Sequence, residues 1–199
     1  MKRNLYGHYR QETTPFMNEE IELLKNVAAK LESAGIEYMM TGSMAMAFYS
    51  TPRMTRDIDF IIQVSPADIG KIIGLFQNEY YIEEESVRYA IINRGMFNII
   101  HNESVIKVDL IIRKDEIYRV EEFARRIKIP VEGVPISVVT PEDLILSKLV
   151  WAKRSQSELQ FRDVRQILLS IKKCDSGYLQ KWSEILGVED LLRKATADE

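Results

Sequence analysis

The chain is short of several residue types that common functional sites require. Its 199 residues include one cysteine, Cys174, and two histidines, His8 and His101. A single cysteine excludes an intrachain disulfide and a cysteine zinc cluster, and it fits a reducing compartment. Two widely separated histidines are too few for a histidine metal site, and neither suggests a Ser-His-Asp triad.

Long hydrophobic runs and an excess of basic charge are also missing. No apolar run approaches the length of a membrane span, and the polar tail over residues 1–14 lacks the apolar stretch of a signal peptide. We therefore expect a cytoplasmic protein with no membrane partner. The formal net charge of −3 argues against binding nucleic acid by bulk charge alone.

The pattern of apolar residues predicts an α/β (α+β) fold with a mixed sheet and a C-terminal helical part. A first amphipathic helix follows Thr14-Pro15 and ends at Gly35. Strands are expected at 37–41, 58–64, 96–101, 105–112, 127–131 and 134–139, and helices at 43–49, 66–76 and 115–126. The segment 82–94 is ambiguous.

From Thr140 onward the pattern becomes helical. Thr140 is a suitable N-cap and Pro141 a suitable first helical residue, and two further helices run through Leu169 and Leu186. We therefore predict an α/β core over residues 1–139, which includes the polar tail 1–14, and a helical subdomain over residues 140–199.

Three aspartates are candidates for binding a metal ion. Asp57 and Asp59 stand two apart at the entry to a predicted strand, so their side chains point to the same side. Two such carboxylates suit a hard divalent ion such as Mg²⁺, although many Asp-x-Asp triplets are solvated strand ends. Asp109 interrupts an apolar strand, where an unpaired carboxylate is costly. Its partner is either a shared metal ion or a salt bridge to Lys107 or to an arginine elsewhere.

Gly42 and Ser43 lie between a predicted strand and a predicted helix. Glycine lets the backbone approach a ligand closely, and the N–H groups at a helix N-terminus attract anions. The pair is therefore a candidate phosphate site that would face Asp57 and Asp59.

This order of motifs resembles the nucleotidyltransferase fold of the DNA polymerase beta superfamily. The resemblance rests on a strand, Gly-Ser, a helix, Arg-x-Thr-x-Asp-Ile-Asp, and a later strand with a third aspartate. The matching residues are Gly42, Ser43, Arg53, Thr55, Asp57, Asp59 and Asp109.

A second block is similar to the abortive-infection (AbiEii-like) nucleotidyltransferase toxins and their bacterial relatives. It consists of residues 140–144, 148–154 and 161–164. The lysine and the aspartate of that family line the active-site cleft, so the resemblance assigns Lys148 and Asp163 to the cleft and to nucleotide binding. From the residues alone, Lys148 either reaches phosphates or solvates its helix, and Arg162 and Asp163 form a surface ion pair equally well.

The resemblance implies transfer of a nucleotidyl group from a nucleoside triphosphate to an acceptor hydroxyl. Asp57, Asp59 and Asp109 would hold two Mg²⁺ or Mn²⁺ ions, and Asp109 is also a candidate acceptor of the hydroxyl proton. Gly42, Ser43 and Lys148 would hold the triphosphate. Candidate acceptors are an RNA such as tRNA, a protein or a small molecule, and a toxin-type enzyme would have an antitoxin as a partner.

Three alternatives remain open from the sequence. An Asp-x-Asp glycosyltransferase also binds a metal nucleotide, but it would not require Gly-Ser, the third aspartate and the C-terminal block in this order. A catalytically silent nucleotide-binding or partner-binding protein could keep the same fold. An antibiotic-modifying nucleotidyltransferase would differ only in its acceptor.

Overall fold

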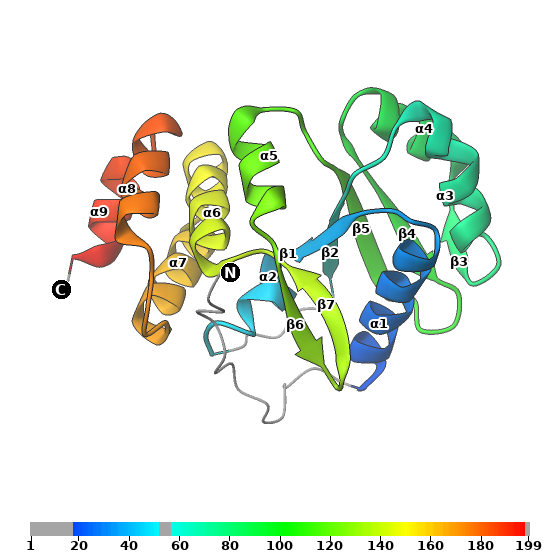
Figure 1. Cartoon of the computed structure of the whole chain (residues 1–199), viewed down its shortest axis with the longest axis horizontal. Helices are drawn as coiled ribbons and strands as arrows, with labels where there is room; N and C mark the ends of the chain where they lie inside the picture. Colours follow the sequence, from blue (N-terminus) through cyan, green and yellow to red (C-terminus); the bar gives the residue numbers. More distant parts are fainter. Residues whose placement is uncertain (1–17, 52–56, 198–199) are drawn as a thin grey trace, which may run out of the picture.

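The structure, a computed structural model, describes residues 18–51 and 57–197. Arg53 and Thr55, two of the residues that carry the resemblance, lie outside these ranges, as do Thr14 and Pro15 at the expected start of the first helix. The described residues form a mixed seven-stranded sheet in the order β3-β4-β5-β2-β1-β7-β6, with helices around it (Figure 1). The predicted fold class is confirmed.

The strands of this sheet are β1 (Tyr38–Thr41), β2 (Ile58–Ile62), β3 (Tyr80–Ile82), β4 (Met96–His101), β5 (Lys107–Ile112), β6 (Ile127–Val131) and β7 (Val134–Val138). The α-helices are α1 (Asn18–Ser33), α2 (Gly42–Met46), α3 (Ile69–Phe76), α4 (Glu84–Ile92), α5 (Ile117–Ala124), α6 (Pro141–Ser155), α7 (Glu158–Ser170), α8 (Ser176–Ile185) and α9 (Glu189–Thr196). A short 3₁₀ turn, Pro66–Asp68, precedes α3.

The centre of the sheet is the pair β2 and β5, which run parallel, while β1 and β4 flank them in antiparallel orientation. One face of this centre is fully buried and carries side chains such as Phe60, Leu110 and Phe97. Helix α1 forms ion pairs near both edges of the sheet. Lys25 pairs with Glu132 in the β6–β7 turn, and Lys30 pairs with Glu79 just before β3. The opposite face is left for the polar side chains described below.

Several boundaries differ from the prediction for local reasons. The ambiguous segment contains α4, which Glu83 caps by accepting hydrogen bonds from the N–H groups of Glu85 and Ser86. Strand β5 begins at Lys107 rather than at Val105, because Val105 adopts a positive φ of 58° that a strand does not allow. Helix α9 was not predicted.

Helices α6 to α9 pack together beside α5, at the end of the molecule away from α3 and α4 (Figure 1). Helix α6 begins as predicted, with the Thr140 hydroxyl accepting a hydrogen bond from the N–H of Asp143 and Pro141 in the first turn. No helix within the described ranges combines the length and the apolar character needed to cross a membrane.

Candidate functional site

Gly42 is required by the close approach of the Asp59 side chain. Its φ of +70° is a left-handed conformation, and a Cβ atom placed there would lie 1.9 Å from Asp59 Oδ2. Any larger residue would therefore collide with the carboxylate as well as strain the backbone. The glycine expected to make room for a ligand makes room first for a site carboxylate.

A polar row crosses the centre of the sheet at this point. Thr41 of β1 stands opposite Asp59 of β2, Asp59 opposite Asp109 of β5, and Asp109 opposite Asn98 of β4. Neighbouring strands lie about 4.8 Å apart, and residues opposite one another project from the same face. Asp57, two residues before Asp59, shares that face. The structure thus brings together the three aspartates predicted from the sequence.

Asn98 was missed by the sequence analysis. It is an exposed amide within an otherwise largely apolar strand, next to Phe97 and Ile99, which are buried. The same signal that identified Asp109, a polar residue interrupting an apolar strand, was available to identify Asn98.

The crowding of carboxylates changes the acidity of Asp59. Burial, followed by the negative charges of Asp109 and Asp57, raises the pKa of Asp59 to about 6, and the positive charges of Lys107 and Lys148 offset part of this effect. The carboxylate is therefore placed where its ionised form is disfavoured unless a cation is close.

Lys107 is one such cation. Its Nζ lies 3.0 Å from Asp109 Oδ2 and 3.8 Å from Asp57 Oδ1. The salt bridge between Lys107 and Asp109, which the sequence offered as the alternative to a shared metal ion, is therefore present. The hydrogen bond to Asp109 is also the main cause of the raised pKa of Lys107.

Lys148 and Asp163 lie together in the interface between α6 and α7. Lys148 Nζ is 2.7 Å from Asp163 Oδ2 and 3.0 Å from the side-chain oxygen of Gln160. Both residues are buried, so Lys148 does not merely solvate its helix and Asp163 is not part of a surface pair with Arg162. The charge of Lys148 nevertheless lowers the pKa of Asp59, which places α6 within electrostatic range of the aspartates.

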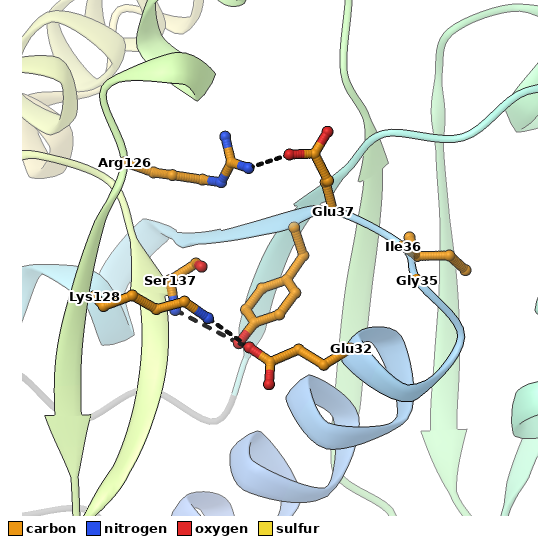
Figure 2. Close-up of a pocket in the computed structure, with 8 residues that line it drawn as sticks. Glu32, Gly35, Ile36, Glu37, Arg126, Lys128 and Ser137 are labelled. Carbon is orange, nitrogen blue, oxygen red and sulfur yellow. Dashed lines mark hydrogen bonds and ion pairs between the residues drawn. The ribbon is translucent and has the colours of Figure 1, made fainter.

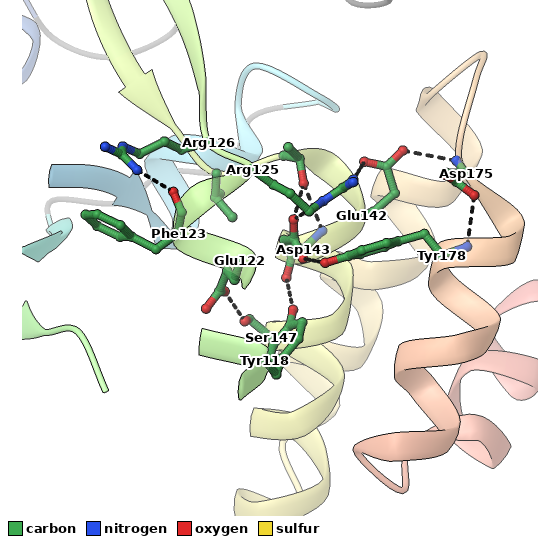
Figure 3. A network of polar contacts seen from close by, with 12 residues as sticks. Tyr118, Glu122, Phe123, Arg125, Arg126, Glu142, Asp143, Ser147, Asp175 and Tyr178 are labelled. Atoms are coloured by element: carbon green, nitrogen blue, oxygen red, sulfur yellow. Dashed lines mark hydrogen bonds and ion pairs between the residues drawn. The ribbon is translucent and has the colours of Figure 1, made fainter. Parts of the chain in front are cut away.

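A buried polar network fixes α6 against α5 and α8 (Figure 3). Asp143 of α6 accepts hydrogen bonds from Arg125 at 3.0 Å and from the Tyr178 hydroxyl of α8 at 2.6 Å. The neighbouring Glu142 accepts a hydrogen bond from the backbone N–H of Asp175 at 3.1 Å. Because every member is held by partners on other elements, the network holds the helix that carries Lys148 in one position.

The chemistry of the aspartates fits a divalent metal ion. Asp109 is only 7% exposed, and within the described residues its Oδ1 atom has no hydrogen-bond partner. A buried carboxylate oxygen without a partner is costly, and oxygen atoms of this type are the ligands that Mg²⁺ prefers. As the side chains are placed, no three acidic, histidine or cysteine residues of the described ranges form a group ready to hold a metal ion.

A separate pocket of about 290 Å³ lies at the other end of β1 (Figure 2). Its lining includes two ion pairs, between Arg126 and Glu37 and between Lys128 and Glu32, each 2.5 Å long. These charges already neutralise one another, and none of the residues predicted for the functional site lines this pocket.

Residues 20–187 match the family described as nucleotidyl transferase of unknown function (DUF2204). No curated protein matches the sequence of this chain. The family match confirms the broader resemblance to nucleotidyltransferases, whereas the narrower resemblance to AbiEii-like toxins stays a prediction.

Solved structures with a similar fold carry related names. An antigenic nucleotidyltransferase-like protein from Paracoccidioides brasiliensis has a TM-score of 0.57 and 16% identity, over 89% of this chain and 92% of that one. The antibiotic-resistance factor ANT(2'')-Ia has a TM-score of 0.56 and 14% identity, over 90% and 94% of the two chains. The lincosamide antibiotic adenylyltransferase LnuA has a TM-score of 0.51 and 13% identity, over 77% and 98%. At these identities the similarity shows the fold alone.

Proposed function

This chain belongs to the DUF2204 family of nucleotidyl transferases of unknown function, and on that premise we propose that it is a metal-dependent nucleotidyltransferase. It would move a nucleoside monophosphate group from a nucleoside triphosphate to an acceptor hydroxyl and release pyrophosphate. The observation that carries the proposal is the register of β2 and β5, in which Asp59 and Asp109 stand side by side on one face with Asp57 beside them.

In the proposed reaction, the acceptor oxygen forms a bond to the α-phosphorus. The bond from that phosphorus to the oxygen bridging the α- and β-phosphates breaks, so that pyrophosphate leaves. Asp57, Asp59 and Asp109 are the residues that would hold Mg²⁺ or Mn²⁺, expected as two ions, whose charge would offset that of the triphosphate. Asp109 accepts the proton of the acceptor hydroxyl, a role for which its Oδ1 atom is suited, since that atom is buried and has no hydrogen-bond partner among the described residues.

Positive charge for the phosphates would come from the helical part of the chain. We assign residues 140–199 to the far wall of the cleft and residues 1–139 to the core that carries the aspartates. Lys148 supports this assignment because its charge acts on Asp59 from α6. Its ion pair with Asp163 aligns the ammonium group rather than leaving it free to follow a ligand. Gly42, Ser43, Arg53 and Thr55 remain the predicted contacts of the triphosphate.

A catalytically silent protein of the same fold is the second candidate. The observation that favours it is the position of Lys107, which already supplies a positive charge to Asp57 and Asp109. Such a protein would bind a nucleotide or a partner without turnover.

The candidate acceptors of the nucleotidyl group belong to several chemical classes. Two proteins with a similar fold are an antibiotic-resistance factor and a lincosamide antibiotic adenylyltransferase, so small molecules belong among the candidates beside RNA, including tRNA, and protein. A toxin role with a cognate antitoxin rests on the sequence resemblance alone.

The decisive experiment is labelling with each of the four nucleoside triphosphates. The protein is incubated with an α-labelled triphosphate, Mg²⁺ or Mn²⁺, and fractionated cell extract, and the label is followed into RNA, protein and small molecules. Asp59→Asn serves as the matched control. Metal-dependent labelling of one fraction by the parent alone supports transfer. Nucleotide binding without labelling of any fraction supports the silent protein instead.

A further inference from the structure

Lys107 occupies a particular place among the site carboxylates. It is the first residue of β5, two residues before Asp109, and its ammonium group lies between an oxygen of Asp109 and an oxygen of Asp57. We propose that Lys107 is an exchangeable internal cation, which holds Asp57 and Asp109 together and must leave them before a divalent metal ion binds. The inference rests on the proposed function, because it concerns the same carboxylates.

The need for such a cation follows from the arrangement of the charges. Asp57, Asp59 and Asp109 are all directed to one face at one end of β2 and β5, and carboxylates at this range repel one another. Asp109 is largely buried, so solvent screens its charge poorly. One ammonium group within 4 Å of two of the three carboxylates, at 3.0 and 3.8 Å, reduces that repulsion.

The exposed fractions of the paired side chains support the departure of Lys107 from the carboxylates. The side chain of Lys107 is 40% exposed and that of Asp57 is 60% exposed, whereas that of Asp109 is only 10% exposed. A lysine at the start of a strand has a flexible four-carbon stem, and rotation of that stem takes its ammonium group into water without moving the backbone. Asp109 has no comparable freedom. The buried pair of Lys148 and Asp163, with side chains 5% and 4% exposed, provides the contrast of a cation that is fixed in place.

The orientation of Asp109 is consistent with this exchange. Lys107 contacts its Oδ2 atom, while the Oδ1 atom is buried with no hydrogen-bond partner in the described part of the chain. One cation thus satisfies only half of the carboxylate. A divalent ion carries more charge and accepts several oxygen ligands, so it would compete well for the whole group once Lys107 has withdrawn.

The test is the affinity of the full chain for Mn²⁺, measured by titration calorimetry at constant pH and without nucleotide. Lys107→Ala should bind Mn²⁺ more tightly than the parent by on the order of threefold to tenfold, the scale expected when one exposed and one partly buried ion pair no longer compete. Lys107→Arg, which keeps the cation, should bind no more tightly than the parent. Lys128→Ala is the matched control, because Lys128 is 52% exposed and pairs with Glu32, which lies away from the site.

A second measurement keeps the test independent of small differences in affinity. In a chelator, Lys107→Ala should melt at a lower temperature than the parent, because Asp57 and Asp109 have lost one nearby positive charge. Added Mn²⁺ should then raise the melting temperature of Lys107→Ala by more than that of the parent. Equal or weaker Mn²⁺ binding by Lys107→Ala would overturn the proposal, since Lys107 would then be a spectator or a residue that positions the metal ligands.

Combining the Mn²⁺ binding test with the labelling assay separates the role of Lys107 from the proposed function. Tighter Mn²⁺ binding by Lys107→Ala together with no nucleotidyl transfer by the parent would uphold the role of Lys107 and favour the silent protein. Nucleotidyl transfer by the parent with unchanged Mn²⁺ binding by Lys107→Ala would uphold the reaction and reject the exchange. Absence of Mn²⁺ binding by both proteins would overturn the exchange, while the proposed reaction would still be decided by the labelling assay with the parent.

Discussion

Lys148 of α6 and Asp163 of α7 form a buried ion pair, with Nζ and Oδ2 2.7 Å apart and side chains that are 5% and 4% exposed. The sequence left open whether Lys148 faces solvent, in which case its removal would cost little stability. The structure removes that alternative, because both side chains are buried and removal of Lys148 takes away a cation 2.7 Å from the Asp163 carboxylate.

Lys148→Ala should therefore destabilise the protein as well as weaken the use of triphosphate. The expected loss in the free energy of unfolding is about 3–5 kcal/mol, measured by urea denaturation. Arg154→Ala on the exposed end of the same helix is the control and should change stability by less than about 0.5 kcal/mol. Replacing both partners, Lys148→Met with Asp163→Leu, should recover much of the loss. A Lys148→Ala variant as stable as the parent would show that the pair is not buried in solution.

Gly42→Ala should be more costly than the same change at another left-handed glycine. Gly35 has a φ of +68° with open space around a Cβ, so Gly35→Ala should cost only about 1–2 kcal/mol of backbone strain. At Gly42 the new methyl group also meets the Asp59 carboxylate, and we expect a further loss of about 1–3 kcal/mol from overpacking. Urea denaturation of both variants measures the difference. In an Asp59→Ala background this additional loss should disappear, and its persistence there would mean that Asp59 does not occupy the space above Gly42.

The raised pKa of Asp59 makes the stability of the protein depend on pH when divalent ions are removed. The folded pKa of about 6 lies above the ordinary value of 3.8, so the folded state binds the proton more tightly than the unfolded state does. The resulting stabilisation is complete below pH 3.8 and is lost as the pH rises through about 6. Asp59→Asn removes this dependence. In a chelator at pH 7.5 to 8 it should be more stable than the parent by about 2–3 kcal/mol at most, and the difference should vanish toward pH 4. Urea denaturation across this range provides the measurement, and identical profiles for the two proteins would contradict the assigned burial of Asp59.

Asp59→Asn should also remove both the stabilisation by Mg²⁺ nucleotide and the nucleotidyl transfer. Asparagine keeps the shape and one carbonyl ligand but loses the charge that binds a hard dication. A Mg²⁺ nucleotide that stabilises the parent by mass action should raise the melting temperature of the variant little or not at all, and nucleotidyl transfer should be abolished. Thermal melting with and without Mg²⁺ nucleotide, paired with the labelling assay, provides both readouts. Equal stabilisation of the two proteins would show that Asp59 is not a metal ligand.

The sequence by itself determined many of the local elements and the shared side of Asp57 and Asp59. The hairpin of β4 and β5 and the start of α6 at Thr140 follow from patterns spanning a few residues. Alternation along an extended chain was sufficient to place Asp57 and Asp59 on one side. Each of these properties depends on neighbours in the chain, and for this reason they were readable before the structure.

Only the tertiary structure decided which distant residues meet. The order of the strands places Asn98 beside Asp109, and the packing of α7 on α6 buries Lys148 against Asp163. A lysine or an asparagine has the same local pattern whether it faces water or another element. Burial and pairing depend on contacts between segments far apart in the sequence, and the contribution of Lys107 to the site became visible only when its distances to two carboxylates were known.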